Sequence, residues 1–366
     1  MGKELLSEFA ATPIRYQMGG IPLSKAYQMC KFSKIEKLSA NENAFGVSPK
    51  AQKAVQEALK DACFYPNMGN CHIKEKIAEN QGISPDQIIL THGGTIALTL
   101  IGEVFLRPGD EIVYSVPTYQ AYQNMARKGC AVIKEVPMEA DMHINFTKMR
   151  EAVTEKTKLV ILCNPNNPTG GYEERQKLLS FIDSLPAHVV VLVDEAYIQF
   201  AGGLAYSMVP YIADKRNLIV VQTFSKIYGM AGFRLGYVMS NPEIIGYLNG
   251  DMDAYEPNSL ALAAGDAALD DVDFVKMTLE ETEKGKQYLK EEMEKLGIRV
   301  FPSYTNFIMF DCGMDAQKIT RSVLEKSGVL IRGTFQYPRI TIGTMEQNRK
   351  FIRAMQEIFS ERNTDE

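Results

Sequence analysis

Short runs of apolar residues recur through the middle of the chain, and most are continuous rather than alternating with polar positions. Continuous runs rich in β-branched residues are typical of strands that helices cover on both faces. Stretches with helical spacing lie between several of them. This alternation predicts an α/β fold with a doubly wound, mostly parallel sheet of about seven strands. The predicted strands are residues 87–91, 111–115, 131–136, 158–163, 189–193, 218–222 and 235–239, and the predicted helices are 95–106, 118–128 and 172–184.

The pattern changes after about residue 245, where a long charged helix is predicted over residues 271–296. Shorter strand and helix patterns follow it and are typical of an α+β domain. We therefore predict a large domain over residues 41–245 and a smaller one formed by residues 246–366 together with the N-terminal arm, residues 1–40. The elements predicted in the smaller domain are strands 298–301, 306–310, 329–332 and 339–342, and helices 315–327 and 345–360.

Composition narrows the class of protein. The 366 residues are 45% hydrophobic and 23% charged, as in a globular domain, and the net charge of −5 argues against a nucleic-acid partner. No apolar run is as long as a membrane span, and acidic residues stand where a secretory signal is basic and then apolar. The six cysteines and four histidines show no metal-ligand spacing. We expect a cytoplasmic enzyme that has no metal site and does not bind a membrane.

The stretch from residue 220 to 237 carries the first candidate chemistry. A β-branched run ends in the hydroxyls of Thr223 and Ser225, Lys226 follows directly, and Arg234 lies eight residues further on. Hydroxyls and a guanidinium bind phosphate. A lysine amine with a lowered pKa forms a Schiff base with an aldehyde. A small molecule that combines an aldehyde and a phosphate is pyridoxal 5′-phosphate.

Other predicted strands also end in polar residues. A glycine turn leads to Gly94 and Thr95 at the start of a helix, where free backbone amides bind phosphate. Asn167 lies in a rigid Asn-Pro-Asn-Asn-Pro-Thr-Gly turn, and Asp194 ends an apolar strand, where a carboxylate needs a partner such as a protonated ring nitrogen. The GxGxxG and GxxxxGK[ST] motifs of dinucleotide and P-loop sites are missing. Because the carboxyl ends of parallel strands share an edge, we expect one site there.

These motifs and their order resemble those of pyridoxal-phosphate enzymes of fold type I, and most closely the histidinol-phosphate aminotransferase family, over nearly the whole chain. The resemblance implies the fold-type I architecture, a large domain with a seven-stranded sheet and a smaller domain. It implies that Lys226 is the covalent anchor and proton carrier, and that Asp194 holds the ring nitrogen protonated. It further implies that Tyr119 stacks on the ring, and that Asn167 and Tyr197 donate hydrogen bonds to the phenolic oxygen.

The resemblance also implies a homodimer with shared sites, because Tyr65 matches a tyrosine that reaches the cofactor phosphate of the other subunit. Tyr16, Arg332 and Arg339 match residues that contact the substrate. The chain departs from the family in its Gly94-Thr95-Ile96 turn, and in the short segment 333–338 between the two arginines. That segment lines the substrate pocket in the family, so the amine donor stays open.

The expected reaction is a ping-pong transfer of an amino group from an amino acid or histidinol phosphate to a 2-oxo acid. The same motifs also allow three alternative functions. The chain is an aminotransferase for aromatic or other amino acids, or it catalyses a decarboxylation, elimination or cyclisation on the same fold. The third and most distant alternative is a regulator that binds pyridoxal phosphate without catalysis.

Overall fold

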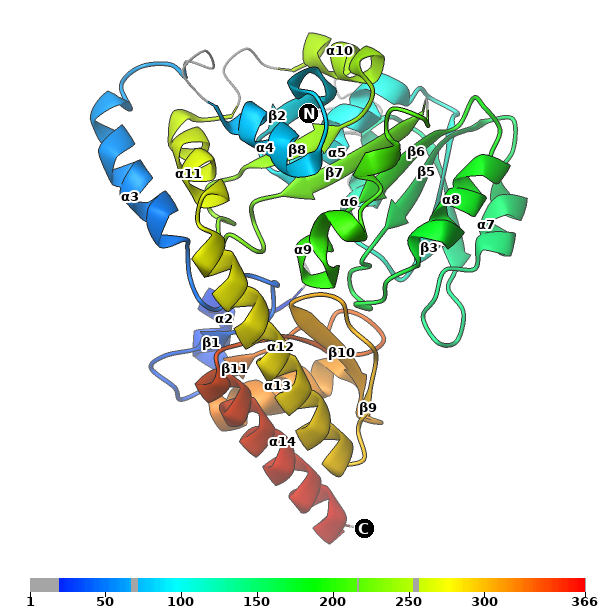
Figure 1. The fold of residues 1–366 in the computed structure, drawn as a ribbon. Coiled ribbons are helices and arrows are strands. Elements are labelled where there is room, and N and C mark those ends of the chain that lie inside the picture. The colour runs from blue at the N-terminus through cyan, green and yellow to red at the C-terminus, as the bar shows by residue number, and fades with distance from the viewer. Residues whose placement is uncertain (1–19, 67–71, 216, 253–256, 366) are drawn as a thin grey trace, which may run out of the picture.

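The computed structural model describes residues 20–66, 72–215, 217–252 and 257–365, and it shows a larger and a smaller body (Figure 1). The larger body is built on a seven-stranded sheet with the strand order β2-β8-β7-β6-β5-β3-β4. Only β8 runs antiparallel to its neighbours, so the predicted mostly parallel α/β sheet is confirmed. The strands are β2 (Ile88–Thr91), β3 (Glu111–Val116), β4 (Val132–Pro137), β5 (Thr157–Cys163), β6 (Val190–Asp194), β7 (Leu218–Thr223) and β8 (Gly236–Met239).

Helices cover both faces of this sheet, which explains why its strands are apolar at nearly every position. Along β6 the alternating side chains divide between two cores, with Val191 and Val193 in one and Leu192 in the other. The core with Leu192 is closed by α5 (Gly94–Phe105), α6 (Ala121–Lys128) and α10 (Pro242–Gly250). The opposite core is closed by α4 (Ile73–Gln81), α7 (Phe146–Ala152), α8 (Arg175–Ser184) and α11 (Ser259–Leu269).

Two of these helices begin later than the sequence predicts. Helix α6 starts at Ala121 rather than at residue 118, because the Thr118 hydroxyl donates to Asn166 Oδ1 at 2.8 Å and holds the chain in a turn. Helix α8 starts at Arg175 rather than at residue 172, since the Glu173 amide donates to Asn164 Oδ1 at 2.7 Å. In both places a hydrogen bond to an asparagine side chain holds the residues before the helix in a turn.

The smaller body contains a three-stranded antiparallel sheet, with β10 (Phe307–Asp311) between β9 (Arg299–Val300) and β12 (Arg339–Thr341). Helices α13 (Ala316–Ser327) and α14 (Met345–Asp365) pack in its core together with α12 (Val272–Lys295). In Figure 1, α12 runs from the larger body, beside α11, down to the smaller one.

The N-terminal segment joins the smaller body. Strand β1 (Glu36–Lys37) pairs in parallel with β11 (Val329–Leu330), and α2 (Leu23–Met29) packs near α13. Helix α11 packs on α3 (Pro49–Ala58) and α4, and it contributes Ala261, Ala264 and Ala268 to the core of the larger body. The described part of the N-terminal segment thus packs with the smaller body, and α11, although it lies beyond residue 245, packs with the larger one. The division into two domains stays a prediction. None of the described helices is both long and apolar enough to cross a membrane.

A close backbone approach anchors the start of α5 to strand β8. A Cβ atom on Gly236 would lie 2.8 Å from the Gly94 nitrogen and 2.9 Å from the Gly93 carbonyl carbon, and neither is the end of a flexible side chain. We predict that Gly236→Ala lowers the free energy of unfolding of the cofactor-free protein by about 1–3 kcal/mol, because the backbone must move apart. Urea denaturation measures the change.

The matched control is Gly232→Ala, four residues earlier, where an added Cβ meets no atom within 4 Å. This variant should keep the wild-type stability to within about 1 kcal/mol. Equal unfolding midpoints for the two variants would show that the approach of β8 to α5 is not under steric constraint.

Candidate functional site

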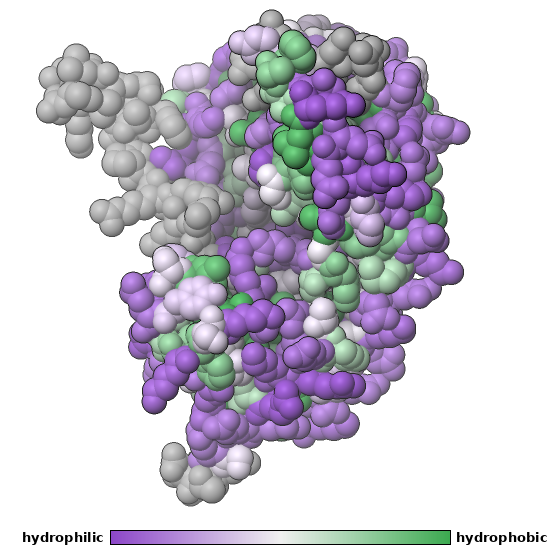
Figure 2. All heavy atoms as spheres, turned by 90° about the vertical axis from the view of Figure 1, so that its left-hand side faces the viewer, coloured by the Kyte–Doolittle hydropathy of each residue, from purple (hydrophilic) through white to green (hydrophobic). Residues whose placement is uncertain are grey.

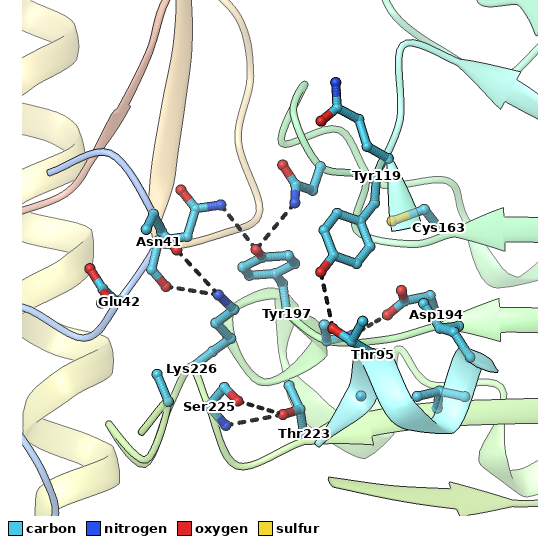
Figure 3. A pocket seen from close by; sticks show the side chains of 18 of the residues that line it. Asn41, Glu42, Thr95, Tyr119, Cys163, Asp194, Tyr197, Thr223, Ser225 and Lys226 are labelled. Carbon is cyan, nitrogen blue, oxygen red and sulfur yellow. Dashed lines mark hydrogen bonds between the residues drawn. The ribbon is translucent and has the colours of Figure 1, made fainter. Parts of the chain in front are cut away.

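A cavity of about 310 Å³ lies where the carboxyl ends of β5, β6 and β7 meet the smaller body. Figure 3 shows its side chains converging from the sheet, from the start of α5 and from the loop around Asn41. The predicted residues that line this cavity are Gly94, Thr95, Tyr119, Asn167, Asp194, Tyr197, Thr223, Ser225, Lys226, Arg234, Arg332 and Arg339. Residues that lie up to 245 positions apart in the sequence thus share one site.

Asp194 ends strand β6 and faces the cavity. Its carboxylate accepts hydrogen bonds from the Tyr122 hydroxyl at 2.8 Å and from the Ala196 amide at 3.1 Å. Burial raises the pKa of this carboxyl, while the charge of Lys226 lowers it slightly. A cation held beside Asp194 would restore its ionised form, so the site suits a protonated ring nitrogen.

The next residue, Glu195, points to the opposite face of the sheet, because side chains alternate along a strand. Its carboxylate accepts from the Ser207 hydroxyl at 2.6 Å, the Met208 amide at 2.7 Å and Gln222 Nε2 at 2.9 Å. Burial raises the pKa of Glu195 to about 7. These bonds tie the end of β6 to the end of β7 and so fix the strand ends from which the cavity residues project.

Lys226 follows β7 and extends into the cavity toward the loop before α3. Its Nζ donates to the carbonyl oxygens of Asn41 at 3.2 Å and Ala40 at 3.4 Å, and it lies 5.4 Å from the centroid of the Tyr197 ring. Burial, and after it the charge of Arg339, lowers the pKa of Lys226 to about 8. A sizeable fraction of this amine is therefore neutral and nucleophilic near neutral pH.

The start of α5 and the segment after β7 form a cradle for an anion. Gly93 has a φ of 83°, and a Cβ on it would lie 2.6 Å from Nη2 of Arg234, so only glycine lets the guanidinium come this close. The Thr223 hydroxyl donates to the Ser225 hydroxyl at 2.9 Å at the same place. Hydroxyls, a guanidinium and a helix N-terminus together suit a phosphate group.

The Tyr119 ring is held from two sides. Its hydroxyl lies 3.2 Å from the Thr95 hydroxyl, and its ring meets that of Tyr122 edge to face at a centroid distance of 5.8 Å. Figure 3 shows the ring inside the cavity with its hydroxyl directed at Thr95. A ring fixed in this way is suited to cover a flat ligand by stacking.

Two amide side chains donate to the Tyr197 hydroxyl, Asn41 Nδ2 at 2.9 Å and Asn167 Nδ2 at 3.5 Å. Burial raises the pKa of Tyr197, so the phenol stays protonated. The amides occupy its lone pairs, and none of the described residues takes its own proton. The hydroxyl is therefore available as a donor to a ligand.

Arg339 begins β12 and is 3% exposed. Its guanidinium donates to Asn167 Oδ1 and, at 3.1 Å, to the carbonyl oxygen of Ser39, while Nε has no hydrogen-bond partner among the described residues. Burial lowers its pKa to about 10, so it remains charged at neutral pH. A charged guanidinium that lines the cavity favours an anionic ligand there.

Arg332 stands beside Arg339 across an antiparallel bridge, with backbone hydrogen bonds of 2.9 and 2.8 Å. The short segment 333–338 closes this hairpin and places Phe335 on the wall of the cavity, 5.7 Å from the Arg339 guanidinium carbon. A Cβ on Gly20 would lie 3.1 Å from Nη1 of Arg332. The shortened segment therefore gives the cavity an aromatic wall next to two cations.

Tyr65 does not line this cavity and is 77% exposed on the surface of the larger body. The other predicted residue, Tyr16, lies outside the described residues. Their roles stay predictions. Sequence reasoning in turn missed Asn41, Tyr122 and Phe335. Tyr122 lies three residues after Tyr119 in the helix that the sequence predicts over residues 118–128, and this spacing is the signal that could have found it.

The described residues fit a flat, phosphate-bearing aldehyde. The missing Cβ of Gly93 makes room for the phosphate cradle, the buried carboxylate of Asp194 lacks a strong cationic partner, and the Lys226 amine is activated by burial. These three features lie in one cavity and match the phosphate, the ring nitrogen and the aldehyde of pyridoxal 5′-phosphate.

Comparison with known proteins agrees with this chemistry. Residues 33–355 match the family model of the class I and II aminotransferases. The chain is 38% identical over 360 residues to a histidinol-phosphate aminotransferase of Moorella thermoacetica, which covers 96% of this chain and 92% of the relative. It is 35% identical over 345 residues to histidinol-phosphate aminotransferase 2 of Carboxydothermus hydrogenoformans, with coverage of 92% and 94%.

The fold also matches a solved structure. The crystal structure of histidinol-phosphate aminotransferase from Sinorhizobium meliloti in complex with pyridoxal 5′-phosphate has a TM-score of 0.88 and 26% sequence identity, over 96% of this chain and 97% of that one. The chain belongs to the class I and II aminotransferase family, and its fold is that of fold-type I pyridoxal-phosphate enzymes. Within the family it is similar to histidinol-phosphate aminotransferases, so the predicted class of pyridoxal-phosphate-dependent transaminase is confirmed.

The lowered pKa of Lys226 has a measurable consequence for cofactor capture. Only the neutral amine attacks an aldehyde, so the rate of capture by the cofactor-free protein should rise about tenfold per pH unit below pH 8 and level off above it. Stopped-flow absorbance from about pH 6 to about pH 10 follows the reaction. A rate that still climbs steeply near the upper end would indicate an ordinary lysine pKa and contradict the assignment.

The control is Lys226→Ala, which should take up pyridoxal phosphate weakly and form no adduct in the cavity that borohydride can reduce. A reducible adduct at this site in the variant would show that another amine is the anchor.

Proposed function

We propose that this enzyme transfers the amino group of histidinol phosphate, or of a related anionic amine, to a 2-oxo acid such as 2-oxoglutarate by a ping-pong mechanism. The observation that carries the proposal is the charged guanidinium of Arg339, which lines the same cavity as the activated Lys226 amine. A buried cation there selects a donor that brings a negative charge close to the reacting amine. The similarity to histidinol-phosphate aminotransferases supports the same donor.

Some of the cavity residues would bind the cofactor, and others would transfer protons. Gly94, Thr95, Thr223, Ser225 and Arg234 would hold the cofactor phosphate. Asp194 would keep the ring nitrogen protonated, and bound pyridoxal phosphate then supplies an electron-withdrawing ring that stabilises negative charge on the substrate carbon. Lys226 would hold the aldehyde.

The remaining cavity residues act beside the ring and on the substrate. Tyr119 would cover the ring, and Tyr197 and Asn167 would donate to the phenolic oxygen. The Lys226 amine, whose pKa burial lowers to about 8, would remove and return the proton at the reacting carbon. Arg332 and Arg339 would bind the substrate anion, with Tyr16 from the N-terminal arm.

We further propose that two copies of the chain form a homodimer with shared sites. Tyr65 lies at the surface with Phe64 and Leu59, which are 69% and 56% exposed, so an apolar surface follows the end of α3. Figure 2 views the molecule from the side on which α3 lies in Figure 1, and hydrophobic side chains are interspersed there among polar ones. The resemblance indicates that a second copy of this chain covers this surface, since Tyr65 matches a residue that reaches the partner's cofactor phosphate.

The donor is tested with the cofactor-loaded enzyme in a single half-reaction, by following the visible band of the cofactor. Histidinol phosphate should convert the band faster than histidinol at equal concentration, because only the former brings the anion that Arg339 binds. Arg339→Lys should raise KM for histidinol phosphate by about tenfold to a hundredfold, since lysine cannot replace a planar guanidinium. Arg299→Lys, an exposed arginine of the same body, is the matched control.

Two outcomes would contradict the proposed donor. In the first, histidinol phosphate leaves the band unchanged while an aromatic or other amino acid converts it. That result would keep the aminotransferase activity and contradict histidinol phosphate as the donor. If a donor loses carbon dioxide or a leaving group and the original band returns unaided, the reaction is a decarboxylation or elimination instead.

The shared site is tested by mixing two inactive variants. Lys226→Ala removes the amine, and Tyr65→Ala removes the residue expected to reach the other subunit. Because a mixed dimer would contain one site with both wild-type residues, we expect mixing to restore a substantial part of one site's activity. Sedimentation of each variant checks that dimers form. A fully active monomer, or a mixture no more active than its parts, would contradict the shared site.

A further inference from the structure

Asn41 lies at the junction of the two bodies and is 1% exposed. Its Nδ2 donates to the Tyr197 hydroxyl at 2.9 Å, and its carbonyl oxygen accepts from Lys226 Nζ at 3.2 Å. On the other side, its backbone amide donates to the Thr341 hydroxyl at 2.9 Å, and its carbonyl oxygen also accepts from Asn306 Nδ2 at 3.2 Å. One residue thus contacts two members of the site and two residues of the smaller body.

The backbone of Asn41 is suited to this place. Its φ is 56°, in the left-handed region that asparagine tolerates better than most residues that carry a side chain. The Thr341 hydroxyl, whose oxygen accepts from the Asn41 amide, donates in turn to Asn41 Oδ1 at 3.3 Å. Because a planar side-chain amide has its donor and acceptor on opposite sides, a donor at Oδ1 turns Nδ2 toward Tyr197.

The direction of the Tyr197 hydroxyl follows from these bonds. A phenol has one proton to donate, and an oxygen that already accepts from Asn41 must point that proton elsewhere. Asn167 Nδ2 also donates to this oxygen, at 3.5 Å, so the proton is turned away from both amides. No other described residue accepts it, and the open side of the hydroxyl is the cavity.

We propose that Asn41 is a positioning residue: its amide fixes the Tyr197 hydroxyl as a hydrogen-bond donor toward the cavity, and Thr341 of the smaller body fixes that amide. The inference rests on the proposed function of Tyr197 toward the phenolic oxygen of pyridoxal phosphate. The orientation of the cavity's phenol thereby depends on the smaller body being docked against the larger one.

The test uses the cofactor-loaded protein without substrate and measures the pH midpoint of the change in its visible absorption band. A hydrogen bond donated to the phenolic oxygen stabilises the charge on that oxygen, so losing it lets the bound cofactor hold its proton to higher pH. Asn41→Gly keeps the left-handed backbone and removes only the amide. We expect the midpoint to rise, by about one pH unit or less, for one weakened hydrogen bond.

A double-mutant cycle shows whether the effect acts through Tyr197. Tyr197→Phe should raise the midpoint at least as far as Asn41→Gly does. In the Tyr197→Phe background, Asn41→Gly should then add little, because the hydroxyl it orients is gone. Equal shifts in both backgrounds would overturn the proposal.

Asn43→Gly is the matched control in the same loop. Its amide donates to the Ile227 carbonyl oxygen at 2.9 Å and not to Tyr197, so the midpoint should stay at the wild-type value. A shift equal to that of Asn41→Gly would assign the effect to loosening of the loop and overturn the proposal. Thr341→Val, which leaves Asn41 in place, should raise the midpoint in the same direction by a smaller amount.

The experiment distinguishes an error in the role of Asn41 from an error in the proposed function. A wild-type protein that forms no visible band with pyridoxal phosphate would contradict the cofactor assignment itself. A normal band whose midpoint is unmoved by both Asn41→Gly and Thr341→Val would overturn only the role of Asn41. Thr341→Val also keeps the inference testable if Asn41→Gly does not fold.

Discussion

The exclusion of water from the Lys226 amine is the constraint on which the rest of this structure depends. Burial is the largest cause of its lowered pKa, and the charge of Arg339 adds to it. Neither body encloses the amine by itself. The larger body supplies the end of β7, the smaller supplies β12, and the 40–42 loop lies between them. The burial that activates the amine therefore depends on residues of both bodies, so contacts that hold the bodies together act on the chemistry through that burial.

Much of this architecture could be predicted from the sequence, because the strands of a sheet covered on both faces must be apolar throughout. Each of the seven predicted runs is a strand, with ends that differ by at most one residue. The cavity could also be predicted in part. Asn167, Asp194 and Lys226 each follow such a strand, and parallel strands bring their carboxyl ends to one edge. Polar residues directly after apolar runs therefore indicated correctly which residues line the cavity.

The parts that could not be predicted depend on contacts between distant segments. Asn41 and Thr341 lie 300 positions apart, and no periodicity connects them. The late start of α6 has the same origin, since Asn166 accepts from the Thr118 hydroxyl across 48 positions. Helix α11 has the composition of any buried helix, so only its packing on α3 shows that it belongs to the larger body. Tyr65 faces outward, and the role expected of it involves a second chain.

Strand β12 orients both amides that flank the Tyr197 hydroxyl. Thr341 donates to Asn41 Oδ1, and Arg339 donates to Asn167 Oδ1, so each amide presents its Nδ2 to the same phenol oxygen. After burial, the charge of Arg339 is the largest cause of the lowered pKa of Lys226. An anion bound beside the Arg339 guanidinium would cancel part of that charge and raise the pKa of Lys226. The neutral fraction of Lys226 therefore depends on whether an anion is bound at Arg339, which couples recognition of the donor to the protonation state of the amine.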